Sequence, residues 1–234
     1  MEKIANKSRA AGMRQGKRNA AGITVSAVCT AAVLYALFFA DAGADGYAVK
    51  LAAPLLCMAL IAAEEIAERL SGVRLPDGLG AAIRLFLLAC LTGGKTLELY
   101  TRLPVYDKLL HTASGALSAL AGSAICRHVY PRSGALTVAF AGLMTALALG
   151  YMWELLEYFG DALFGMNSQC WRDAVIGTTD GGWIVSDPRG SALPDTMEDM
   201  TVNLLGAVVP FAVISALPYR RTYPPPRTAG SGRI

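Results

Sequence analysis

Charged residues are scarce in this sequence, and their scarcity excludes an ordinary soluble globular domain. Only 17% of its 234 residues are Asp, Glu, Lys or Arg, whereas 54% are hydrophobic and the mean hydropathy is +0.41. A soluble domain of this length normally carries about a quarter charged residues. The apolar residues also occur in long blocks rather than in short amphipathic stripes, so we predict an integral membrane protein.

Cysteine pairs with a functional spacing are also missing. Four of the five cysteines lie inside apolar stretches, where a thiol behaves as a small hydrophobic side chain, and only Cys170 lies in a loop. No two have a metal-ligand or redox spacing, so neither a CxxC-type centre nor a disulfide framework is predicted. Histidine is limited to His111 and His128, and His128 lies beside Arg127 at a predicted helix end, where we interpret it as interfacial.

The sequence does contain several long apolar runs. A membrane-spanning helix needs about 20 mostly apolar residues. Residues 20–40 carry no charge, since none occurs between Arg18 and Asp41, and this run is too long for the core of a cleaved signal peptide. The predicted spans are residues 20–40, 47–64, 79–99, 108–126, 135–159 and 197–217. We therefore predict an all-α polytopic transmembrane bundle with about six helices, or five if one of the weaker middle spans fails.

The placement of Lys and Arg gives the orientation. With six spans, one side receives 15 of the 21 basic residues and the other side receives 6. Cytoplasmic segments carry the excess of basic residues, so both termini are predicted to be cytoplasmic in a bacterial inner membrane. The basic N-terminus is then a topology signal, and no nucleic-acid partner is predicted. The expected organisation is an N-terminal segment (1–19), a transmembrane domain (20–218) with an outer loop near 162–194, and a cytoplasmic tail (219–234).

Ionisable side chains gather where three predicted helices end on the outer side. Their spacing places them on one face of each helix: Asp107 and His111; Glu154, Glu157 and Asp161; Asp195, Asp199 and Asn203. Small residues such as Gly115, Gly122 and Gly206 continue these faces and allow helices to approach closely. The three polar faces are therefore predicted to meet at the top of a tight bundle.

Two interpretations of these residues are open. Solvated charges at helix ends fit Lys108, Asp161, Asp195 and Glu198. His111, Glu154 and Asn203 lie a turn or more inside apolar stretches, where polar groups are costly and usually face a cavity, a partner or an ion. We therefore favour a functional cluster. Its predicted active residues are His111, Glu154, Glu157, Asp199 and Asn203, and its rim residues are Asp107, Asp161 and Asp195.

One imidazole among several carboxylates suits Zn, Mn, Fe(II) or Mg. The candidate ligands of such a divalent metal ion are His111, Glu154, Glu157 and Asp199, and the ion would activate a water molecule. Sharing of a proton between Glu154 and Glu157 is the alternative, and it suits an acid–base pair or a proton-coupled carrier. The long outer loop hints at a lid or a binding segment.

A short motif elsewhere suggests different chemistry. Glu64, Glu65 and Arg69 match the EExxxR element of intramembrane CAAX-type proteases, which also need two further membrane-embedded histidines. The predicted topology puts Glu64 on the side opposite His111. We therefore interpret this motif as a solvated inner helix end.

The cluster motifs resemble the YjdF family of bacterial inner-membrane proteins. The matching segments are YDKLLH from Tyr106, WELLEY from Trp153, GMNSQ from Gly165, and DTMEDM from Asp195 with Asn203 and Gly206. Their order and spacing agree across residues 79–217. A looser likeness extends to VanZ-like proteins, which share a DK-x-x-H start and a D-x-x-x-N-x-x-G helix.

The resemblance implies a fold and candidate positions but no reaction, because the YjdF family has no established activity. VanZ-like proteins are associated with glycopeptide-antibiotic tolerance, which implies an envelope lipid or cell-wall precursor as ligand, although the longer loop 170–194 departs from their pattern. Three functions remain open: an outward-facing site that binds or processes an envelope lipid with metal assistance, a small proton-coupled transporter, or a structural or accessory membrane protein.

Overall fold

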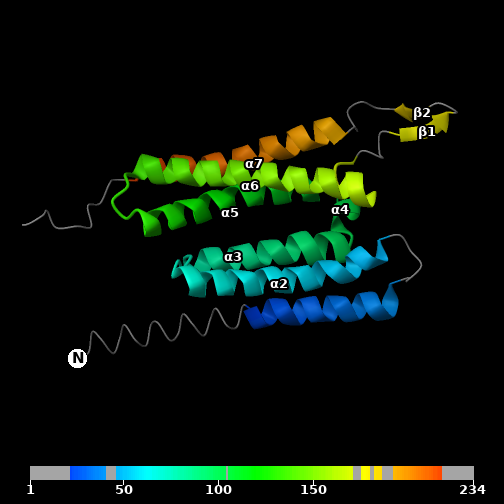
Figure 1. The fold of residues 1–234 in the computed structure, drawn as a ribbon, viewed down its shortest axis with the longest axis horizontal. Helices are drawn as coiled ribbons and strands as arrows, with labels where there is room; N and C mark the ends of the chain where they lie inside the picture. Colours follow the sequence, from blue (N-terminus) through cyan, green and yellow to red (C-terminus); the bar gives the residue numbers. More distant parts are fainter. Residues whose placement is uncertain are drawn as a thin grey trace, which may run out of the picture.

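The fold is a bundle of helices that run side by side along one axis (Figure 1). It is seen in a computed structural model that describes residues 22–40, 46–103, 105–170, 175–179, 182–185 and 192–217. Five helices are long and apolar enough to cross a membrane: Gly22–Phe39, Asp77–Thr96, Tyr106–Val129, Ala135–Phe164 and Ala192–Ser215. The predicted all-α polytopic bundle is confirmed. The predicted terminal segments 1–19 and 219–234 lie outside the described residues.

The first half of the bundle consists of the unlabelled blue helix in Figure 1 (Gly22–Phe39), α2 (Tyr47–Ser71) and α3 (Asp77–Leu87). α2 has 25 residues and covers the second predicted span. It lies alongside the five helices named above but is not among the helices that are apolar enough to be counted as candidate spans. Its Pro54 is buried within the helix. Cys29 and Cys57 are fully buried in the apolar core of this half, which confirms that they act as small hydrophobic groups.

The third predicted span is a composite of two kinds of helix. α3 continues into a π-helical segment, η1 (Leu88–Thr96), which is followed by the single turn α4 (Leu99–Arg102). Gly93 and Gly94 lie in the π-helical segment and make room for tyrosines. A Cβ atom on Gly93 would lie 2.8 Å from the Tyr106 hydroxyl, and one on Gly94 would overlap the Tyr100 ring. The two glycines therefore serve close packing at this end of the span.

The second half consists of α5 (Tyr106–Val129), α6 (Ala135–Phe164) and α7 (Ala192–Ser215), which are packed closely together (Figure 1). Cβ atoms added to Gly115 or Gly206 would collide with the backbones of Asn203 and Thr112, respectively. One added to Gly122 would collide with the Thr145 side chain. The predicted close approach through small residues is thus confirmed.

The connection between α6 and α7 contains a β-hairpin that the sequence did not predict. Strands β1 (Val175–Thr179) and β2 (Gly182–Val185) pair antiparallel beyond the helix ends (Figure 1). Between α6 and the hairpin, the chain turns at Gly165, whose φ of 63° is left-handed. The carboxylate of Asp161 then accepts backbone N–H groups from Ser168 at 2.7 Å and from Gln169 at 3.0 Å. This segment is therefore fastened to the end of α6.

Candidate functional site

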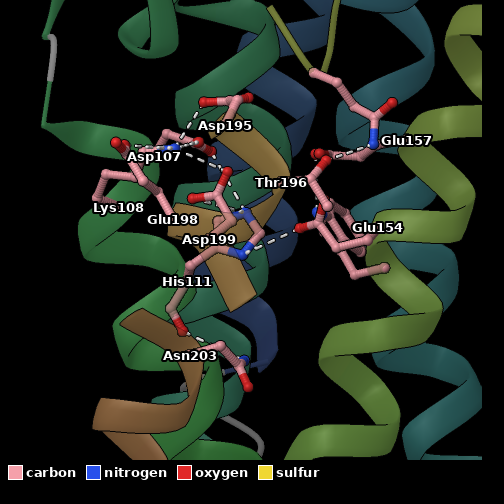
Figure 2. A network of polar contacts seen from close by, with 12 residues as sticks. Asp107, Lys108, His111, Glu154, Glu157, Asp195, Thr196, Glu198, Asp199 and Asn203 are labelled. Atoms are coloured by element: carbon pink, nitrogen blue, oxygen red, sulfur yellow. Dashed lines mark hydrogen bonds and ion pairs between the residues drawn. The ribbon is translucent and has the colours of Figure 1, made fainter. Parts of the chain in front are cut away.

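His111 lies at the centre of the polar residues that α5, α6 and α7 bring together (Figure 2). Its Nδ1 atom faces Glu154 of α6, with 3.8 Å to Oε1. Its Nε2 atom faces the other way, 3.6 Å from Asp107 Oδ1 and 3.9 Å from Asp199 Oδ1 of α7. The imidazole is buried, at 7% exposure. The structure thus places one ring between acids of three helices, as helical spacing suggested.

Lys108 occupies one side of this cluster. Its ammonium group donates hydrogen bonds to Asp195 Oδ1 at 2.7 Å and to Asp199 Oδ2 at 2.9 Å, and lies 3.6 Å from Asp107 Oδ2. The interpretation of Lys108 and Asp195 as solvated charges is wrong, because these contacts join α5 to α7 and bury much of both side chains. Glu198, 69% exposed and 4.0 Å from the ammonium group, does fit that interpretation.

Asp161 was also interpreted as a solvated charge, and this too is wrong. Its side chain is buried, and its two backbone hydrogen bonds hold the segment after α6. That segment presents Gln169, whose amide donates a hydrogen bond to Thr196 Oγ1 at 2.8 Å. Asp161 therefore acts at the rim by positioning the loop.

Glu154 and Asp199 are buried acids with unsatisfied oxygens. Glu154 is 5% exposed, and neither carboxylate oxygen has a hydrogen-bond partner among the described residues. The same holds for Oδ1 of Asp199, which is 1% exposed. Glu157 accepts a hydrogen bond from Trp153 Nε1 at 2.9 Å, so Trp153 supports the cluster. Unpaired buried carboxylates are unstable as anions, and a cation or a proton is needed to balance them.

Asn203 lies below the cluster and contacts backbone rather than acids (Figure 2). With its amide turned so that both ends are satisfied, Nδ2 donates to the Ala146 carbonyl at 3.3 Å and Oδ1 accepts from Gly115 N–H at 3.2 Å. Its side chain also fills the space beside Gly150, which has no Cβ to obstruct it. These contacts tie α7 to α5 and α6, so Asn203 has the position of a structural residue.

Two overlapping sets of metal-ligand atoms share His111. One is Asp107, His111 and Asp199, and the other is His111, Glu154 and Glu157; within each set the atoms lie within 4.8 Å of one another. Ligands at about 2.1 Å from a tetrahedral zinc ion lie about 3.4 Å apart. Small side-chain movements would therefore close either set on an ion.

Three residues near α4 adjoin the cluster, and the sequence reasoning did not single them out. Cys90 Sγ and the Tyr100 hydroxyl lie 3.2 Å apart, and Lys95 Nζ lies 4.9 Å from the centre of the Tyr100 ring. Lys95 also interacts electrostatically with Glu157. Burial raises the pKa of Tyr100 far above its usual range, so its hydroxyl stays protonated. The Gly93-Gly94 pair is the sequence feature next to these residues that signals close packing.

Two cavities reach the cluster from different faces. One, of about 320 Å³, lies between the two halves of the bundle and has His111, Trp153 and Asn203 in its wall. The other, of about 330 Å³, lies between α6 and α7 and has Glu154 and Thr196 in its wall. The His111–Glu154 pair therefore separates two cavities.

The EExxxR motif lies near the end of α2, away from the hairpin. Glu64 and Glu65 pair there with Arg84 of α3, at 2.8 Å and 3.4 Å, and the Arg84 side chain is 3% exposed. Its interpretation as a solvated helix end is wrong for Glu64, which forms a largely buried ion pair between two helices. Arg69 fits that interpretation, because it is exposed and lies 3.9 Å from Glu65.

These features define a polytopic helical membrane protein with a buried histidine–carboxylate cluster. A family model described as "Predicted membrane protein (DUF2238)" matches residues 23–220. The match spans most of the chain, so the protein belongs to this family. Neither the comparison with curated proteins nor that with solved structures gives a match.

Proposed function

We propose that the protein uses a divalent metal ion, held at the outer face of the bacterial cytoplasmic membrane, to bind and process the polar end of an envelope lipid. The observation that carries this proposal is the state of Glu154: a buried carboxylate 3.8 Å from His111 Nδ1, which only the neutral groups of Thr196 and Gln169 approach and which has no hydrogen bond of good geometry among the described residues. An ion bound by both side chains would balance that charge.

Lys108 determines which of the two ligand sets takes the ion. Its ammonium group already neutralises Asp195 and Asp199 and lies near Asp107. A divalent cation beside these acids would be repelled by the lysine. Glu154 and Glu157 form no salt bridge with Lys or Arg among the described residues, so the set of His111, Glu154 and Glu157 is the more suitable.

Asp199 then has a supporting role. With the ion on Nδ1 of His111, the Nε2–H group points toward the unsatisfied Oδ1 of Asp199 at 3.9 Å. A carboxylate that accepts the second ring N–H fixes the tautomer and orientation of a metal-binding histidine. In this proposal Asp199 is a positioning residue, whereas the sequence predicted it as a ligand.

A divalent ion held by His111, Glu154 and Glu157 would supply Lewis-acid chemistry: it would polarise a phosphoryl or carbonyl oxygen and lower the pKa of bound water. The cluster lies toward one end of α5, α6 and α7, which suits hydrolysis or transfer at a lipid headgroup. The looser resemblance to VanZ-like proteins agrees with an envelope lipid or cell-wall precursor as the substrate class.

The transporter alternative receives less support. Beyond Asn203, the contact between α5, α6 and α7 is lined by Ala119, Ala146 and Ala207, followed by Val138 and Ile214. In the described part of these helices, no acidic or basic side chain continues the cluster toward the far end of this core. A proton or ion path would need such groups.

Metal binding to purified protein tests the proposal. Wild-type protein, stripped with a chelator and then supplied with Zn²⁺ or Mn²⁺, should unfold at a higher temperature, with about 2.7 kcal/mol of added stability at 100-fold excess over Kd. Glu154→Gln should lose this response, whereas Asp199→Asn should weaken binding about 10- to 100-fold.

Glu198→Gln, which alters an exposed acid of the same helix, is the matched control and should respond like wild type. A wild-type protein that gains no stability from either metal, and carries none on elemental analysis, would contradict the proposal.

A further inference from the structure

The cavity between the two halves of the bundle is apolar apart from one wall. None of the described side chains that line it is acidic or carries a fixed positive charge. Most of its polar groups come from α5 and α7, namely His111, Ser114, Ser118 and Asn203. The remaining walls are formed largely by leucines and aromatic residues of α2, α3, η1 and α6. Such a lining favours hydrocarbon over any charged ligand.

The mouth of this cavity faces the bilayer. Leu56 of α2 and Met152 and Leu156 of α6 line it and yet are 49%, 52% and 61% exposed. The exposed surface of membrane-spanning helices meets lipid tails, which are as apolar as leucine. A hydrocarbon chain is therefore the group that is present at this opening and can enter it without desolvation cost.

The other end of the cavity reaches the polar cluster. His111 is both a wall of the cavity and the centre of the cluster. Trp153 also lines the cavity, and its indole N–H donates to Glu157. A molecule with its chain in the cavity would therefore have its polar end beside His111, Glu154 and Glu157.

Resting on the proposed function, we infer that the cavity holds one acyl chain of a membrane phospholipid whose phosphate reaches the metal ion at His111, Glu154 and Glu157. Its volume of about 320 Å³ is at the lower end of the range for ligand pockets, about 300–1,000 Å³, which suits one chain rather than two. Phosphate oxygens are ligands that hard divalent ions accept. Without the ion, the surrounding carboxylates would repel the phosphate.

Photolabelling in vesicles tests this assignment. The full-length protein is reconstituted with Mn²⁺ in phosphatidylethanolamine and phosphatidylglycerol, with a trace of phosphatidylethanolamine that carries a diazirine at the end of one acyl chain. Labelled peptides are identified by mass spectrometry. Labelling should concentrate on the cavity wall at Ser114 and Ser118, above the background at Met144, which is exposed outside this cavity.

A pair of variants on α2 provides the control. Leu60→Trp fills the cavity, whereas Leu55→Trp adds the same side chain at a 51% exposed position outside its lining. Wall labelling should fall about tenfold in Leu60→Trp and stay unchanged in Leu55→Trp, because the buried methylenes of the chain are excluded only by the first. Ser118→Phe fills the cavity from α5 and should repeat the loss if Leu60→Trp does not fold.

Equal wall labelling in the filled and control variants would overturn the inference. So would displacement of the label by a polyprenyl phosphate at concentrations where added phosphatidylglycerol has no effect, because the occupant would then be a prenyl chain. Metal-induced stabilisation is measured on the same samples. If Leu60→Trp loses labelling but still binds metal, the result supports the acyl-chain site in the cavity. If the cavity is labelled in a protein that binds no metal, the result contradicts the proposed function and not the acyl-chain site.

Discussion

At the scale of single residues, the cluster is organised by the position of the Lys108 ammonium group. Lys108 pairs with acids of α7 on one side of His111, and the acids of α6 on the other side form no salt bridge with Lys or Arg among the described residues. Without a lysine at position 108, neither of the two sets of metal-ligand atoms would be preferred. The identity of position 108 therefore bears directly on which carboxylates are available to a ligand.

Removal of this lysine should be costly. Lys108→Met leaves Asp199 buried at 1% exposure without its cation, and breaking a buried ion pair costs about 3–5 kcal/mol, less where one partner is part-exposed. We expect a loss of about 2–4 kcal/mol in the free energy of unfolding, measured by denaturant titration in detergent micelles.

The double variant Lys108→Met/Asp199→Asn should recover part of this loss, because no unpaired charge then remains. Glu198→Gln should change stability by less than about 0.5 kcal/mol, as surface substitutions usually do. If the double variant were no more stable than Lys108→Met alone, the pairing of Lys108 with Asp199 would not be the source of the effect.

At the scale of elements, the positions of the helices followed from the sequence, because apolar length and i, i+4 spacing are local properties. The fourth and fifth expected spans begin within two residues of α5 and α6. The partners of Lys108, Asp161 and Arg84 did not follow, because ion pairs across helices depend on which faces meet. The π-helical segment was not predicted either, because its composition differs little from that of an α-helix that contains glycines.

Close contact between α5 and α7 gives a prediction for two glycines. In Gly115→Ala and Gly206→Ala the new methyl group would overlap a backbone atom of the facing helix, which cannot rotate away. We expect each variant to lose about 1–3 kcal/mol, the usual cost of overpacking, and to unfold earlier in the same denaturant titration.

Gly78→Ala serves as the control, because it lies in the first turn of α3 with nothing within 4 Å of an added Cβ. Alanine favours a helix over glycine by up to about 1 kcal/mol, so this variant should match or exceed wild-type stability. Equal losses at positions 78, 115 and 206 would show that helix contact is not responsible.

At the scale of the whole molecule, the predicted orientation places the cluster and hairpin outside the cell. A green fluorescent protein fused after residue 234 should fluoresce, because it folds in the cytoplasm, whereas alkaline phosphatase inserted between residues 186 and 191 should be active, because it folds outside. A fluorescent fusion in the loop together with an active phosphatase at the C-terminus would reverse the orientation.

The π-helical segment Leu88–Thr96 has a further consequence for this protein. A π-helix has more residues per turn than an α-helix, so it displaces every following residue around and along the axis. If the same residues of this segment were wound as an α-helix, the following chain would rotate by roughly 100° where it enters α4. Tyr100 would then leave the space beside Gly94, and the wall that it gives to the apolar cavity would be lost. The winding of this one segment thus sets the wall of the cavity without moving any acid of α5, α6 and α7.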